Sequence, residues 1–175
     1  LHSIAALCVE MNGCDVAEIY TPPRFTPKCS AWGLRPGFVV DLTTRSPAGE
    51  HWDLGRPDHE RELERLQEEE DPELVIGSPP CGSFSPLLRI VCTPERIAQK
   101  KAEEGEPHIR VAARAYKRQL DKGKHFLHEH PKDSDSWDMD EIKELAARDD
   151  VYVVRGPMCR WKMTSPGQEG YVRKE

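Results

Sequence analysis

The 175-residue sequence has no apolar run that approaches the ~20 residues of a membrane-spanning helix, so no membrane association is predicted. The first seven residues carry no basic leader of the kind that opens a signal peptide. The six cysteines show neither paired zinc spacing nor a compact disulfide framework. We therefore expect reduced thiols in an intracellular protein, with nucleus and cytoplasm not distinguished.

Basic residues are also outnumbered by acidic ones. The chain has 25 Lys and Arg against 31 Asp and Glu, a net charge of −6, so the chain as a whole is not a basic nucleic-acid-binding surface. Any contact with DNA would have to come from a local patch or from a longer polypeptide. The length suits one domain, 1–175, with a core at about 15–155.

Strand-like and helix-like segments alternate along the chain. Predicted strands lie at 15–20, 37–41, 74–76, 124–130 and 151–154, and predicted helices at 58–70, 107–122 and 138–148. This alternation predicts an α/β fold, a Rossmann-like doubly wound domain with a mainly parallel sheet. The usual glycine-rich turn after the first strand is missing, because Thr21-Pro-Pro-Arg-Phe25 stands there.

A cysteine follows the strand at 74–76, in the string Gly77-Ser-Pro-Pro-Cys81-Gly-Ser-Phe-Ser85. Parallel sheets bind ligands beyond the carboxyl ends of their strands, and two prolines stiffen the segment that presents the thiol. Cys81 is therefore a candidate nucleophile. The competing interpretation is a buried cysteine that packs as a small apolar side chain.

The predicted strand at 124–130 ends in His128-Glu129-His130 before Pro131. Glu129 would then end a strand next to the one before Cys81, where a carboxyl group can share a proton with a substrate. The alternative is a polar strand end exposed to solvent. A metal site at the two histidines is disfavoured, on the expectation that their side chains point to opposite faces.

These strings resemble cytosine-C5 DNA methyltransferases, in which a strand leads to Pro-Pro-Cys and a later strand ends in Glu-Asn-Val; here His130 replaces the asparagine. The resemblance implies a truncated methyltransferase-type domain that uses S-adenosylmethionine and DNA. Cys81 would add to C6 of cytosine, and Glu129 would engage N3. Implied cofactor contacts are Tyr20, Pro22, Pro23, Asp41, Asp53, Leu54 and Pro79, with Asp41 at the ribose and Asp53 near the adenine. Implied substrate contacts are Ser83, Phe84, Ser85 and His130.

In that family the region after the nucleophile is a mobile loop that closes over a flipped base. Here 86–106 joins an apolar patch to a charged run, which fits either such a loop or an inserted helix that covers a sheet edge.

The family's Gln-x-Arg-x-Arg motif and target-recognition domain have no counterpart in this sequence. A second resemblance is to methyltransferase-like segments of retroelement polyproteins, through Tyr-x-Pro-Pro-Arg, Asp-Leu-Thr-Thr, Ser-Pro-Pro-Cys and His-Glu-His-Pro. It implies a piece of a longer polypeptide. Two functions stay open: a methyltransferase, or a catalytically inactive module that binds nucleic acid or protein.

Overall fold

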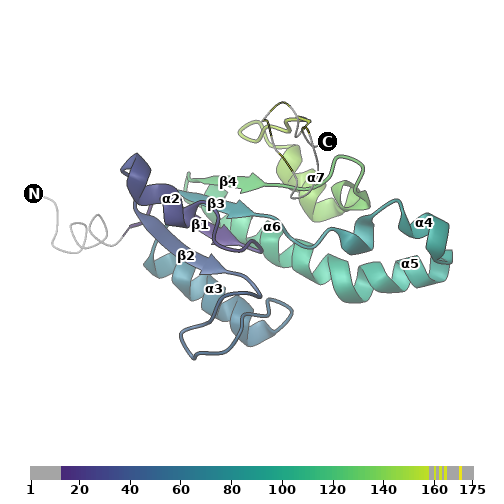
Figure 1. Cartoon of the computed structure of the whole chain (residues 1–175), viewed down its shortest axis with the longest axis horizontal. Helices are drawn as coiled ribbons and strands as arrows, with labels where there is room; N and C mark the ends of the chain where they lie inside the picture. Colours follow the sequence, from purple (N-terminus) through teal and green to yellow (C-terminus); the bar gives the residue numbers. More distant parts are fainter. Residues whose placement is uncertain (1–12, 158–159, 161, 163, 165–169, 171–175) are drawn as a thin grey trace, which may run out of the picture.

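A parallel β-sheet forms the centre of the computed structural model, which describes residues 13–157, 160, 162, 164 and 170. Its four strands lie in the order β2-β1-β3-β4 and all run in the same direction (Figure 1). They are β1 (Val16–Ile19), β2 (Pro36–Val40), β3 (Leu74–Gly77) and β4 (His125–His128). The prediction of an α/β fold with a parallel sheet is confirmed, and the arrangement is compatible with a Rossmann-like fold.

Helices cover both faces of this sheet. The long helices α3 (Pro57–Glu69) and α6 (Glu106–Asp121) share one hydrophobic core with the strands and with the shorter α7 (Asp140–Ala146). The short α2 (Thr26–Cys29) packs on the opposite face. Among the helices of the described residues, none combines the length and the apolar character needed to cross a bilayer.

Side-chain alternation along the strands divides the core between the two faces. Ala17 and Ile19 of β1 belong to the cluster under the long helices, whereas Val16 packs with Cys29 and Ile76 on the α2 face. Successive strand residues point to opposite faces, so one buried strand supplies both clusters. This explains why β3 is a continuous apolar run.

A pair of buried amides joins α3 to α6. Gln67 donates from Nε2 to the Gln119 side-chain oxygen at 2.7 Å and to the Ala115 carbonyl at 2.9 Å. Gln119 in turn donates to the Pro72 carbonyl at 2.8 Å, before β3. Buried polar groups are tolerated when they are hydrogen-bonded, so this network fixes both helices against the sheet.

The segment 86–106 is largely helical. It contains α4 (Leu88–Val91), α5 (Pro94–Lys100) and a π-helical turn (Lys101–Gly105) that runs into α6. Thr93 caps α5 by accepting the N–H of Arg96. Figure 1 shows α4 and α5 projecting beyond the sheet, not covering its edge. We call α4 and α5 the helical hairpin.

The predicted strand at 151–154 is not formed. Tyr152, Val153 and Val154 are 84%, 58% and 85% exposed, and the Val151 N–H is bonded to the Arg148 carbonyl in a turn after α7. Strand propensity reflects the packing of a side chain against neighbouring strands, and residues 151–154 have no neighbouring strand in the described part of the chain.

Candidate active site at the carboxyl ends of β3 and β4

The Cys81 loop leaves the sheet at Gly77, the last residue of β3. A side-chain methyl at Gly77 would collide with the buried hydroxyl of Tyr116, so only glycine fits there. Pro79 is buried and Pro80 is exposed. Cys81 is half-buried, and its carbonyl accepts the Phe84 N–H at 3.1 Å. Cys81 therefore follows the carboxyl end of β3 and, unlike Cys14 and Cys29, is not fully buried.

Phe84 anchors this loop to the rest of the molecule. Phe84 and Ser83 are buried, and a side chain at Gly105 would collide with the Phe84 ring. Ser85 is half-buried, and its hydroxyl accepts the Leu87 N–H at 3.3 Å. Of the three loop residues implied as substrate contacts, Ser83 and Phe84 are thus turned into the protein.

Glu129 comes directly after β4 and has an exposed side chain. Its backbone N–H donates to the Gly77 carbonyl at 2.9 Å, and His128 lies opposite Gly77 in the parallel register. Cys81 and Glu129 therefore follow the ends of adjacent, hydrogen-bonded strands. Groups in this position gather at one edge of a parallel sheet.

The two histidines beside Glu129 share a face of the sheet, which corrects the expectation that they diverge. The rings of His128 and His130 stack with centroids 5.3 Å apart and planes inclined by 16°. Residues two apart in an extended chain point to the same side. Trp137 lies edge-on to both rings, from the 3-10 turn Asp135–Asp138.

Each of these imidazoles is anchored through one nitrogen. Nδ1 of His128 lies 3.1 Å from the Tyr116 hydroxyl, and Nδ1 of His130 lies 2.6 Å from the Ser136 hydroxyl and 3.0 Å from that of Ser134. The Nε2 atoms of both rings are buried and have no hydrogen-bond partner. Such orphaned atoms are uncommon in folded proteins.

Burial favours the neutral form of both imidazoles. It lowers the pKa of His128 to about 3, with a smaller contribution from His130. Burial also lowers the pKa of His130, although the nearby backbone of Pro79 and Pro80 acts in the opposite direction. His130 thus lies against the segment that carries Cys81. Within the described ranges, no group of three or more His, Cys, Asp or Glu side chains could hold a metal ion.

The two aspartates implied for cofactor binding occupy different surroundings. Asp41, half-buried after β2, accepts hydrogen bonds from the backbone N–H and the hydroxyl of Thr43 at 2.9 and 2.6 Å. Asp53 is exposed and accepts the Gly55 N–H at 2.9 Å. Leu54 is buried in the core beneath this turn.

Tyr20 and His108 form a contact that the sequence did not predict. The Tyr20 hydroxyl lies 3.2 Å from Nδ1 of His108, and the rings meet edge to face at 5.5 Å. Burial lowers the pKa of His108, and Asp53 counteracts that effect. Tyr20, Asp53 and His108 therefore gather near the carboxyl end of β1. A histidine within the apolar stripe of a helix gives no distinct signal in the sequence.

The turn that replaces the glycine-rich loop is organised by Glu18. This carboxylate is fully buried in β1 and accepts the backbone N–H groups of Arg24, Phe25 and Thr26, the last at 2.7 Å. It also accepts the Thr26 hydroxyl at 2.8 Å. The backbone amides at the start of α2 thus already have a hydrogen-bond acceptor inside the protein. The sequence signal for this arrangement is Glu18 itself, an acidic residue within an otherwise apolar strand. Pro22 and Pro23 of this turn are exposed.

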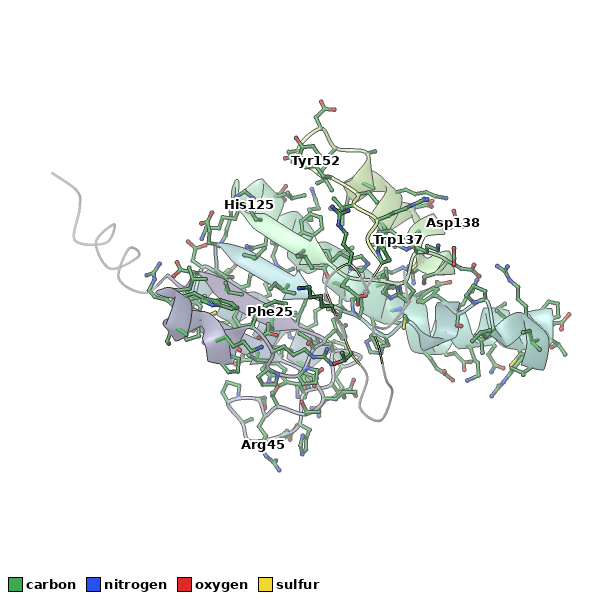
Figure 2. The ribbon with its side chains drawn as sticks, turned by 45° about the horizontal axis from the view of Figure 1, so that its top comes forward. Phe25, Arg45, His125, Trp137, Asp138 and Tyr152 are labelled. Atoms are coloured by element: carbon green, nitrogen blue, oxygen red, sulfur yellow. The ribbon has the colours of Figure 1, made fainter. Side chains whose placement is uncertain are left out.

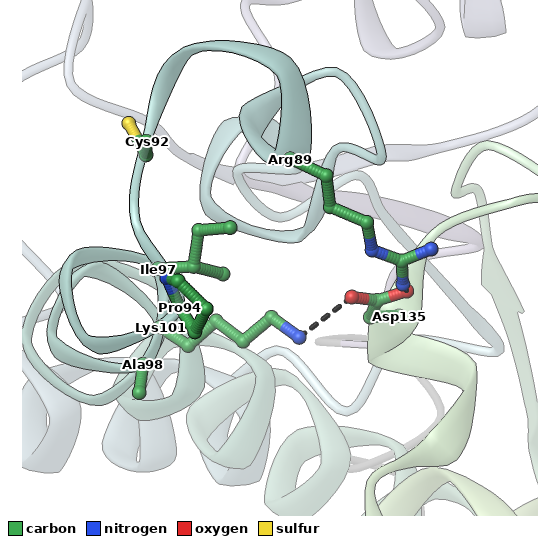
Figure 3. Close-up of a pocket in the computed structure, with 7 residues that line it drawn as sticks. All are labelled: Arg89, Cys92, Pro94, Ile97, Ala98, Lys101 and Asp135. Carbon is green, nitrogen blue, oxygen red and sulfur yellow. Dashed lines mark hydrogen bonds and ion pairs between the residues drawn. The ribbon is translucent and has the colours of Figure 1, made fainter.

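A separate cavity of about 510 Å³ lies between the helical hairpin and the turn at Asp135 (Figure 3). Arg89 and Lys101 both pair with Asp135, at 2.8 and 2.6 Å, and Lys101 is the main cause of the lowered pKa of that carboxyl. Pro94, Ile97 and Ala98 supply its apolar wall. The cavity contains Cys92 but not Cys81.

Comparison with known proteins identified no relative of this chain. The chain matches no protein-family model, and searches of curated proteins and of solved structures gave no match. Parallel α/β folds host many unrelated activities. The arrangement of side chains therefore carries the functional argument.

Proposed function

We propose that the chain is an S-adenosylmethionine-dependent methyltransferase-like domain that acts on cytosine C5 in DNA. The observation that carries this proposal is the position of Cys81 and Glu129 after the adjacent strands β3 and β4. A nucleophile and a proton-sharing carboxyl group at one edge of a sheet are the two groups that addition to a pyrimidine ring requires.

In the proposed reaction, the thiolate of Cys81 forms an S–C bond to C6 of a flipped cytosine. The carboxyl group of Glu129 shares a proton with N3 and so limits the negative charge that builds up in the ring. Once C5 has gained the methyl group, loss of the C5 proton to a base restores the 5,6 double bond, breaks the S–C6 bond and regenerates Cys81. Flipping costs about a few kcal/mol for a duplex and less for a single strand.

The cofactor would lie beyond β1 and β2. Carboxylate oxygens accept hydrogen bonds from hydroxyl and amino groups, so Asp41 and the exposed Asp53 suit the adenosine part of S-adenosylmethionine. The ring of Tyr20, close to Asp53 and His108, adds an aromatic surface. When bound, the cofactor would supply the methyl group.

The second candidate is a module that keeps the fold and binds nucleic acid or protein without catalysis. The Glu18 carboxylate favours it, because the amides of Arg24, Phe25 and Thr26 are already bonded inside the protein. Such amides at a helix start are otherwise available to an anionic ligand. In this case the two aspartates would be ordinary turn residues.

Trapping with an oligonucleotide that contains 5-fluorocytosine tests the first candidate. Fluorine at C5 blocks the final elimination, so an active chain with S-adenosylmethionine should form a stable protein–DNA adduct. Cys81→Ala should abolish the adduct, whereas Cys92→Ala, at a half-buried thiol on the hairpin, should retain it. An adduct that survives Cys81→Ala would exclude Cys81 as the nucleophile.

Calorimetric titration separates the two candidates. Saturable binding of S-adenosylmethionine that weakens in Asp41→Ala or Asp53→Ala supports the methyltransferase. A folded chain that binds oligonucleotides but neither S-adenosylmethionine nor S-adenosylhomocysteine supports the non-catalytic module.

A further inference from the structure

β4 has an open edge in the part of the chain that the structure describes, since it pairs only with β3. The N–H groups of His125 and Glu129 donate to β3, to the carbonyls of Glu73 and Gly77. Main-chain groups alternate in direction along a strand, so those of Phe126 and His128 face the open edge. An exposed edge of this kind is a template for another strand.

The same chain carries a suitable strand in Val151-Tyr-Val-Val154. β-branched and aromatic residues are those that strands favour, and three of these four side chains are at least 58% exposed. Figure 2 shows Tyr152 at the periphery of the molecule. On β4, Leu127 is also 46% exposed. A segment with strand propensity and an open strand edge are thus both exposed in this chain.

Charge selects one alignment of the two segments. In a parallel register that places Phe126 opposite Tyr152, Lys124 falls opposite Asp150 and Glu129 opposite Arg155. The antiparallel alignment of the same six residues would pair Lys124 with Arg155 and Glu129 with Asp150. Opposite charges across strands stabilise a pair and like charges destabilise it. The parallel register also continues the direction of the existing sheet.

We propose that the open edge of β4 binds residues 151–154 of a second copy of this chain, in the parallel register. Residues 151–154 do not pair with β4 of their own chain. The Arg148 side chain donates hydrogen bonds of 2.8 and 2.7 Å to Asp150, and the Arg148 carbonyl accepts the Val151 N–H. Reciprocal exchange would fill both edges at once and close a two-fold dimer.

The register fixes which backbone groups bond. The Phe126 N–H donates to the Val151 carbonyl, and the Val153 N–H donates to the Phe126 carbonyl, as in the pairing of β3 with β4. The N–H of Val154 points away from β4. On the side-chain level, Tyr152 packs beside Phe126 on the face that carries α6.

Light scattering over a range of protein concentrations measures this association. The mass should rise from the 19.9 kDa of one chain to twice that value. Val153→Pro removes a donor that the ladder uses and should weaken dimerisation at least tenfold. Val154→Pro is the matched control, since it introduces the same ring at a donor that the ladder does not use.

A charge-reversal pair tests the register. Lys124 already forms an ion pair with Asp71, so the proposed pair of Glu129 with Arg155 gives the clearer test. Arg155→Glu should weaken the dimer, and the double variant Arg155→Glu with Glu129→Arg should restore it.

Three outcomes would overturn the proposal. The first is a monomeric mass at every concentration. The second is a monomer whose amides at 151–154 are protected from hydrogen exchange, because the segment would then occupy its own β4. The third is a mass that grows past the dimer, which would indicate an open chain of copies.

Discussion

The hydroxyl of Tyr116 lies 3.1 Å from Nδ1 of His128 and directly over Gly77, the residue that β3 places opposite that histidine. One buried phenol therefore links α6, the strand that leads to Cys81 and the strand that leads to Glu129. The candidate site depends on this contact for its shape.

Gly77→Ala should destabilise the fold by about 1 to 3 kcal/mol, because the new methyl group overlaps the Tyr116 hydroxyl. Tyr116→Phe alone should cost about 1 to 3 kcal/mol, since it removes the partner of His128 Nδ1. The double variant should be more stable than the sum of the two single effects predicts. Urea unfolding of the four proteins measures this coupling, and simple additivity would contradict it.

Stability should fall with acidification. His128 and His130 have lowered pKa values in the folded state, so the unfolded chain binds protons first as the pH drops below about 6.5. Each histidine should then reduce the free energy of unfolding by about 1.4 kcal/mol per pH unit until its folded pKa is reached. For His128 this window extends down to about pH 3.

Urea unfolding at pH 7, 6 and 5 measures that slope. His128→Gln and His130→Gln should each reduce it. An unchanged slope in both inner variants would show that other groups control the acid response.

Glu18→Gln should destabilise the chain by about 2 to 4 kcal/mol, because an amide cannot accept all of the hydrogen bonds that converge on the carboxylate. Thr26→Val should cost only about 1 kcal/mol, since it removes one of them. Glu73→Gln, at an exposed position, serves as the control and should stay within about 0.5 kcal/mol. Equal effects of Glu18→Gln and Glu73→Gln would contradict the assigned role.

The described thiols should separate by their reactivity. Cys81 and Cys92 are half-buried, whereas Cys14 and Cys29 are buried, and burial raises the pKa of Cys14 to about 12. Alkylation at pH 7.5 followed by peptide mapping should label the first two at least about 100-fold faster than Cys14. Comparable labelling of Cys14 in a folded sample would contradict its burial. Cys8 and Cys159 lie outside the described residues.

The alternation of helices and strands was predictable because β1, β2 and β3 are rich in apolar residues and each long helix has an apolar stripe. The location of Cys81 and Glu129 at strand ends followed from the same pattern. The side chains that surround them did not follow from that pattern, since these come from distant parts of the chain.

Three features were not predicted from the sequence. Glu18 accepts hydrogen bonds from backbone N–H groups six to eight residues later, Tyr20 contacts His108 from another element, and residues 151–154 have strand propensity but form no strand. The shared face of His128 and His130 was predictable from strand geometry, and the opposite expectation was wrong.

The close contact between Gly105 and the Phe84 ring links the helical hairpin to the loop that carries Cys81. Gly105 ends the π-helical turn that joins α5 to α6, and Phe84 lies three residues after Cys81. A larger side chain at Gly105 would therefore displace the Phe84 ring and, with it, the loop that carries Cys81. The order of the Cys81 loop thus depends on a residue at the base of the helical hairpin.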